Sequence, residues 1–156
     1  MSIYRVDKTE QPVVLFQADG SVMKGVVFLS ACAYSHIGQQ TLTDLLREKG
    51  DFFPFRNEAG GFCVTNKTSI THIRYEQLAT EQEYAPLGNP VEVQINFVGG
   101  EQLRGTVIIE MPEGRNRLFD FVNSMSGFFP LRNGVAHYLV NVAQLRDISP
   151  CCPAAE

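Results

Sequence analysis

Few side chains of this sequence are able to act as a nucleophile or a general base. The three histidines, His36, His72 and His137, are far apart in the chain. A hydroxyl or thiol nucleophile needs a base held against it. Cys32 and His36 share the segment 30–39 and are the basis for a hydrolytic enzyme as a third hypothesis. No recognisable catalytic motif accompanies them, and we expect a protein that is not an enzyme.

The cysteines do not have the spacing of a metal site. Cys32, Cys63, Cys151 and Cys152 form no CxxC pair, and no histidine follows them at the spacing of a zinc finger. Cys63 has the setting of a small core residue in a strand. Cys151 and Cys152 belong to a short tail, which we expect to be exposed. We therefore predict no metal site and no cofactor.

The clearest pattern in the chain is an internal repeat. Residues 52–57 read FFPFRN, and residues 128–133 read FFPLRN. A search for such self-similarity comes before any assignment of fold. The pattern predicts a tandem duplication with repeat 1 at 11–75, a linker at 76–88, repeat 2 at 89–150 and a tail at 151–156. Further matches pair Pro12-Val13 with Pro90-Val91, Gly20 and Gly25 with Gly100 and Gly105, Leu42 and Asp44 with Leu118 and Asp120, and Asn66, Ile70 and Ile73 with Asn141, Leu145 and Ile148.

Each repeat has the pattern of a small β-rich unit. Two apolar runs flank a glycine turn and predict a hairpin. A short amphipathic helix follows, at 41–49 with Thr41 as its cap and at 117–125 in the second copy. Strands are predicted at 52–56, 62–66 and 69–73, and at 128–132, 137–141 and 144–148. The unit order is β-β-α-β-β-β, and the fold class is mostly β (α+β). Because a small sheet alone leaves an apolar face exposed, we expect the copies to pack as one compact body about a pseudo-twofold axis.

The charged residues that both copies share are candidates for binding. Asp44 and Asp120 lie early in the helices, where the helix dipole favours a carboxylate. Arg56 and Arg132 end matched strands. Each arginine either pairs internally with that aspartate or meets a carboxylate or phosphate of a partner.

Two further features are candidates for contact with a partner. The segment 30–39 (SACAYSHIGQ) has no counterpart in the second copy, so Tyr34 and His36 are the asymmetric site candidates; the alternative is a plain connection. Phe119 is an apolar residue of the second helix. Of Phe52-Phe53 and Phe128-Phe129, one residue of each pair faces away from its own core, because side chains alternate along a strand. We predict that this residue lies at the contact between the repeats; stacking on a nucleobase is the alternative.

A family resemblance accompanies these motifs. The segment 13–25 (VVLFQADGSVMKG) resembles the first motif of Sm-like small β-barrels, and 64–73 (VTNKTSITHI) resembles their second motif. The resemblance implies a small barrel or a related open sheet and the binding of single-stranded RNA. Asp120 and Asn123 have the spacing of the family's RNA pocket but fall in a predicted helix, and the Arg-Gly of the second motif is absent, so no RNA site is assigned. The chain also looks like bacterial tandem-repeat domains in which a helix ends in Asp-x-x-Asn.

Composition limits the function classes. The net charge is −4 and the pI is about 5.4, which opposes a broad basic face for nucleic acid. There is no apolar run of membrane-spanning length and no secretory signal, so we expect a cytoplasmic protein without a membrane partner. Our leading hypothesis is a non-enzymatic binding or assembly module of unknown ligand, with a protein partner or self-association. Sm-like binding of single-stranded RNA is the alternative.

Overall fold

The computed structural model describes residues 8–30, 40–76, 88–109 and 117–151. Within them the chain is mostly β, as predicted from the sequence. We call residues 8–76 the first half and residues 88–151 the second half. The first half contains β1 (Lys8–Gln17), β2 (Val22–Ser30), α1 (Leu42–Arg47), β3 (Phe52–Asn57), β4 (Phe62–Asn66) and β5 (Ile70–Tyr75). The second half contains β6 (Asn89–Phe97), β7 (Gln102–Ile109), α2 (Arg117–Ser124), β8 (Phe128–Asn133), β9 (Ala136–Asn141) and β10 (Leu145–Pro150).

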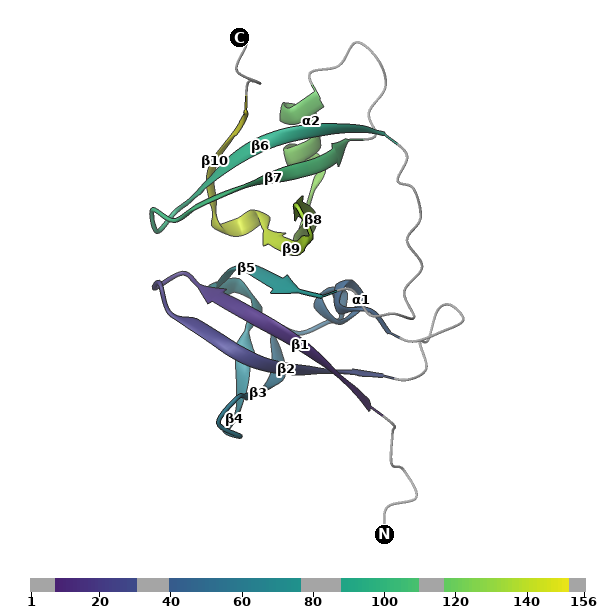
Figure 1. Cartoon of the computed structure of the whole chain (residues 1–156), viewed down its shortest axis with the longest axis vertical. Coiled ribbons are helices and arrows are strands. Elements are labelled where there is room, and N and C mark those ends of the chain that lie inside the picture. Colours follow the sequence, from purple (N-terminus) through teal and green to yellow (C-terminus); the bar gives the residue numbers. More distant parts are fainter. Residues whose placement is uncertain (1–7, 31–39, 77–87, 110–116, 152–156) are drawn as a thin grey trace.

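All ten of these strands belong to one antiparallel sheet, in the order β10-β6-β7-β8-β9-β5-β1-β2-β3-β4. The first half contributes β5-β1-β2-β3-β4 and the second half contributes β10-β6-β7-β8-β9 (Figure 1). The sheet is open, and β4 and β10 are its two edges in the part of the chain that the structure describes.

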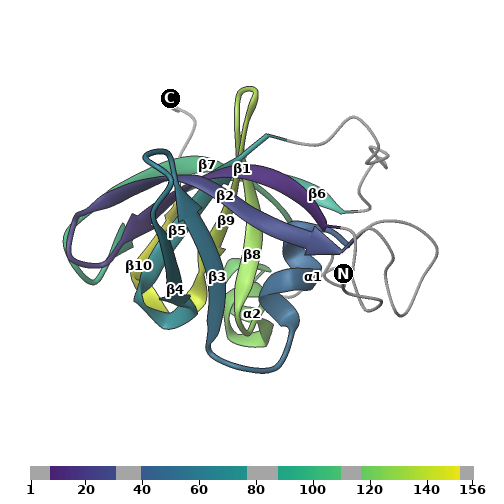
Figure 2. The same ribbon diagram turned by 90° about the horizontal axis from the view of Figure 1, so that it is seen from below.

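In each half the strands curve around a helix, α1 in the first and α2 in the second (Figure 2). Alternation along β1 places Val13 and Leu15 in the interior, at 3% and 0% exposure. In the second half Val93 and Ile95 do the same on β6. The buried apolar side chains form two clusters, each made of residues of one half, except that Leu139 of the second half belongs to the first cluster. The two halves therefore have largely separate cores, which meet at Leu139.

The helix α1 is short because its sequence begins and ends it within two turns. Thr41 accepts a hydrogen bond from the backbone N–H of Asp44 at 3.1 Å, and the Asp44 carboxylate accepts one from the Thr41 N–H at 3.1 Å. This reciprocal pair is a capping box, so Asp44 has the structural role that its helix position favours. The buried Lys67 side chain donates to the carbonyl of Glu48 just after the helix, at 2.8 Å.

The two halves meet edge to edge through β5 and β9. Ile73 lies opposite Leu139, and His72 lies opposite Val140. A twofold axis would accompany the contact of β5 with β9 by its symmetry mate, a contact of β10 with β4, whereas β10 and β4 lie at opposite edges of the sheet. The predicted pseudo-twofold packing is therefore wrong. The contact joins two different edges, which is a heterologous arrangement.

The strand register also corrects one detail of the sequence comparison. Val13 lies opposite Gly25 in the first hairpin, and Val93 lies opposite Gly105 in the second. Val13 therefore corresponds to Val93, and the match of Pro12-Val13 to Pro90-Val91 is displaced by two residues.

Candidate functional site

The junction between β5 and β9 is built from apolar side chains of the second half that enter the core of the first. Leu139, on β9, is 1% exposed and belongs to the cluster that contains Ile70 and Ile73. Phe128, on the neighbouring strand β8, packs against the same cluster. The prediction that one phenylalanine of each pair lies at the contact between the halves is thus confirmed for Phe128.

Polar side chains close the junction at its end. The buried Asn141 side chain donates to the carbonyl of Ile70 at 2.8 Å, and its Oδ1 accepts from the N–H of Ala143 at 3.0 Å. Gln144 donates to the carbonyl of Thr68 at 2.6 Å. These contacts fix the register of β9 on β5, because a shifted strand would leave the buried amide of Asn141 without its partners.

The opposite side of the junction is a stack of rings around His72. The imidazole lies between Phe16 and Phe97, with centroid distances of 4.2 Å and 5.0 Å. Tyr138 contacts it in a tilted arrangement, and Thr71 Oγ1 lies 2.9 Å from its Nδ1. Burial disfavours the charged imidazolium and lowers the pKa of His72 to about 4 from its usual 6.5.

We expect the fold to become less stable as the pH is lowered, because of His72. Between pH 6.5 and about 4 the unfolded chain binds a proton at this residue and the folded chain does not, so acidification favours unfolding. The loss by pH 4 is on the order of 3 kcal/mol in the free energy of unfolding, and none is expected above pH 7. Urea denaturation at pH 7, 5 and 4 measures it.

The matched variants for this experiment are His72→Phe and His137→Phe. His137 lies near Tyr75 in the same junction, with a centroid distance of 5.7 Å. The first variant is expected to lose less stability than the unmodified chain on going from pH 7 to 4, and the second to lose as much. An equal loss in the unmodified chain and in His72→Phe would contradict the assignment.

The open edge β4 carries apolar side chains that face water. Phe62 and Val64 are 65% and 59% exposed, and Phe52 on the adjoining strand β3 is 55% exposed. Val64 occupies the position of Leu139, and Phe52 occupies that of Phe128, because both strand pairs share one register. The residues that fill the junction on β8 and β9 thus have exposed counterparts on β3 and β4.

The open edge β10 is the counterpart of β5. Leu145 and Ile148 occupy the positions of Ile70 and Ile73 and are half-buried, whereas Ile70 and Ile73 are fully buried. The difference arises because β9 and Phe128 cover β5 and no described strand covers β10. Hydrogen bonds from Asn96 at 2.6 Å and from Arg146 at 2.9 Å lower the pKa of the edge carboxylate Asp147.

The candidate charged residues lie on four different elements: Asp44 on α1, Arg56 on β3, Asp120 on α2 and Arg132 on β8. Arg56 forms an ion pair with Glu10 at 2.7 Å and lies over the ring of Phe28 at 5.5 Å, so its internal partner is not Asp44. Arg132 is exposed on β8 and also takes part in an interaction. Asp120 is half-buried on α2.

The remaining candidates divide between the surface and the undescribed segments. Phe119 is 68% exposed on α2, and its carbonyl accepts a hydrogen bond from Asn123 at 2.9 Å. Tyr34 and His36 lie outside the described residues. Sequence reasoning did not select Phe62, Val64 or Ile148. For Val64 and Ile148, the match to Leu139 and Ile73 through the repeat pattern was a usable signal.

The described residues contain a hydroxyl beside an imidazole at Thr71 and His72, but these side chains are 1% and 3% exposed. A substrate cannot reach them, and their contact is structural. No group of three or more metal-ligating side chains occurs among the described residues. No helix in the described ranges is long and apolar enough to cross a membrane.

In the described residues the chain is therefore an antiparallel β protein with one continuous open sheet. Comparison with protein-family models, curated proteins and solved structures found no match to this chain.

Proposed function

We propose that this protein is a non-enzymatic assembly module that associates with copies of itself by pairing β4 of one chain with β10 of the next. The observation that carries the proposal is the internal junction, in which the counterparts of these strands, β9 and β5, already pair. The proposal includes a tandem duplication of one open-sheet unit, in which each unit presents one edge of each kind. A contact between unlike edges leaves the same two edges free at the ends.

The internal junction predicts the register between chains. Leu139 opposite Ile73 translates to Val64 opposite Ile148, and Tyr138 opposite Arg74 translates to Cys63 opposite Ser149. In this register Phe52 would cover the apolar core of the next chain, as Phe128 does within the chain. Each side chain buried in this way contributes roughly 1.5–3 kcal/mol.

The backbone groups that face the open side of β10 support the same pairing and determine where the hydrogen-bond ladder would end. Cys151 donates its N–H to the carbonyl of Glu92 at 2.8 Å, so the alternating residues Ile148 and Pro150 face the open side of β10. Pro150 has no N–H to donate. The ladder between chains would therefore rely on the pair of Val64 and Ile148, with the exposed aromatic side chains adding affinity.

The register can be tested by a disulfide. Cys63 and Ser149 would form a non-hydrogen-bonded pair, since both backbones point to the inner neighbours β3 and β6. Such pairs bring Cα atoms to about 4.5 Å, which suits a disulfide. In a chain with Cys32, Cys151 and Cys152 changed to serine, Ser149→Cys is expected to form linked dimers and higher species under mild oxidation.

The control for cross-linking is the same chain with Cys63→Ser added, in which these species should disappear. Linked species that persist without Cys63, or no linkage at 100 μM protein, a concentration of roughly the order at which weak edges associate, would contradict the register.

A second variant tests association without chemistry. Val64→Lys places a charge on the edge, which is a device that blocks strand pairing. We expect sedimentation velocity to show the unmodified chain as larger assemblies and Val64→Lys as a monomer. Val98→Lys, at a turn residue that is 62% exposed, should leave the assemblies intact. A monomeric unmodified chain would overturn the proposal; a ring and a filament would both support it.

A further inference from the structure

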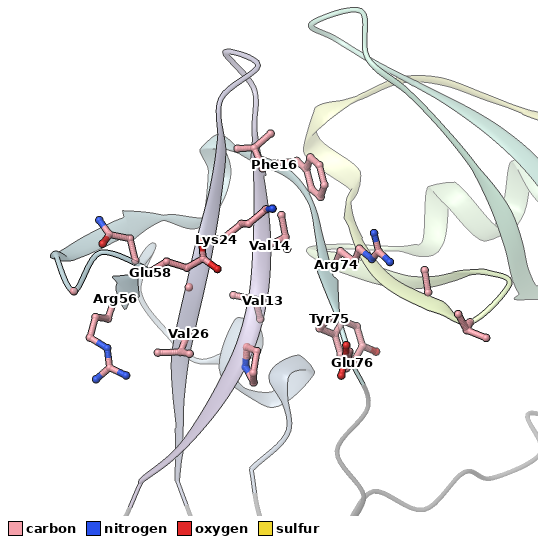
Figure 3. Close-up of a pocket in the computed structure, with 17 residues that line it drawn as sticks. Val13, Val14, Phe16, Lys24, Val26, Arg56, Glu58, Arg74, Tyr75 and Glu76 are labelled. Carbon is pink, nitrogen blue, oxygen red and sulfur yellow. The ribbon is translucent and has the colours of Figure 1, made fainter.

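A groove lies on the outer face of the first half, away from both open edges. Its volume is about 980 Å³. The floor is formed by β1 and β2, with Pro12, Val14 and Val26 among its residues, and β5 contributes Arg74 to one side (Figure 3). The β3–β4 turn bounds one end through Asn57, Glu58 and Gly60, and the β8–β9 turn bounds the other through Val135 and Ala136.

The apolar floor is a property of the first half alone. An antiparallel sheet with one wet face normally alternates apolar and polar residues, whereas strands covered on both faces are apolar throughout. The outer face of β1 and β2 is apolar, and the register-matched positions of β6 and β7 are mostly polar. The matched pairs are Pro12 with Glu92, Val14 with Gln94, Phe16 with Asn96, Val22 with Gln102 and Val26 with Thr106.

Two cationic side chains flank the floor. Lys24 and Arg74 each lie opposite Val14, on the strands to either side of β1. Their Cα atoms are therefore two strand spacings apart, roughly 10 Å. Both side chains are exposed, and neither has an ion pair within the described ranges.

At the corresponding positions of the second half, the cationic side chain has a hydrogen-bond partner. There Arg104 takes the place of Lys24 and donates to Gln94 at 3.0 Å. In the part of the chain that the structure describes, Lys24 thus has no ion pair, whereas Arg104 at the matched position donates a hydrogen bond to Gln94. Glu58 and Glu76 also line the groove and contribute negative charge to it.

We propose that this groove binds an extended peptide segment of another protein in which an apolar residue is flanked by two acidic ones. The apolar side chain faces Val14. The carboxylates of its two neighbours start on the opposite side of the peptide, because side chains alternate along an extended chain. The long side chains of Lys24 and Arg74, on the strands to either side of Val14, extend past the peptide to meet them. Residues two apart in an extended peptide are about 7 Å apart, a distance that flexible lysine and arginine side chains span. The groove crosses several strands, so about five extended residues fit between the two turns.

The experiment uses the full chain with Val64→Lys, so that association through the open edges does not affect the result. Backbone amide chemical shifts are followed by NMR while the acetylated peptide Gly-Glu-Val-Glu-Gly is added, with Gly-Gln-Val-Gln-Gly as the neutral control. We expect saturable shifts centred on Val14, Lys24 and Arg74 with the acidic peptide, several-fold weaker binding at 300 mM than at 50 mM salt, and at least tenfold weaker binding of the neutral peptide.

Variants of the groove make the test specific. Lys24→Gln with Arg74→Gln should weaken binding of the acidic peptide at least tenfold, and Arg104→Gln should not change it. Glu58→Gln should tighten binding, because it removes a repelling carboxylate. Equal binding of the two peptides, shifts centred on the second half, or shifts at the groove with a uridine hexamer but not with the acidic peptide would each overturn the proposal.

Discussion

Replacing Gly25 with alanine is expected to lower the free energy of unfolding by about 3 kcal/mol or more. A Cβ atom at this position would overlap the backbone oxygen of Arg56 and come within 2.8 Å of the Cα of Asn57. Both neighbours are backbone atoms of β3, which pairs with β2 at this point and cannot move away without losing its ladder. Urea denaturation of the purified variant measures the loss, and failure to accumulate as a folded protein is the extreme form of the same result.

The control for this variant is Gly60→Ala, in the β3–β4 turn. Gly60 has a φ of +94° and no neighbour within 4 Å of an added Cβ. Its cost is conformational and amounts to about 1–2 kcal/mol. If Gly25→Ala proved no more destabilising than Gly60→Ala, the close crossing of β2 and β3 would not be the reason for a glycine at position 25.

The second large effect is expected at Leu139. Leu139→Ala removes a side chain of the second half that is 1% exposed within the core of the first half, and such truncations cost about 2–5 kcal/mol. Because the residue links the halves, the loss should appear in the unfolding of both, which calorimetry would register as one transition shifted to lower temperature. The matched position Val64 is exposed in the single chain, and Val64→Ala, measured at a protein concentration low enough to prevent association, should change stability by less than about 0.5 kcal/mol. Two separate transitions, with only one displaced, would contradict a coupled junction.

Local patterns predicted the elements well because local chemistry determines them. The segment FFPFRN became β3, and the threonine cap with Asp44 began α1 at Leu42. Gly20 and Gly100 adopt the positive φ angles, 91° and 96°, that their hairpin turns require. The strands and helices therefore follow from the spacing of apolar residues and turn residues.

The arrangement of the halves did not follow from the same patterns. Apolar periodicity reports that a side chain is buried but not which neighbour buries it. Leu139 enters the opposite core, whereas Val140 stays in its own, although the two are adjacent in the sequence. Burial at a sheet edge and burial at a sheet face give the same apolar periodicity. No residue of the sequence therefore distinguished a pseudo-twofold packing from an edge-to-edge contact.

The candidate site shows the same limit. The charged residues common to both halves were chosen as candidates because they recur. However, Arg56 forms an ion pair with Glu10, and no carboxylate occupies the position matched to Glu10 in the second half. The more informative signal was the difference between matched positions. Val64 is exposed whereas its counterpart Leu139 is buried, which identifies β4 as an edge without a neighbouring strand. Val14 is apolar whereas its counterpart Gln94 is polar, which identifies the apolar floor of the groove.

The internal junction between β5 and β9 has a consequence for the order in which contacts form. Its two strands belong to one polypeptide, so they meet at an effective concentration set by the connecting chain, typically in the millimolar range for short connections. The equivalent contact between molecules depends on the amount of protein present. If the chain associates as proposed, dilution should therefore separate the assemblies into intact chains before it opens any chain, and the size of an assembly would report how much of the protein is present.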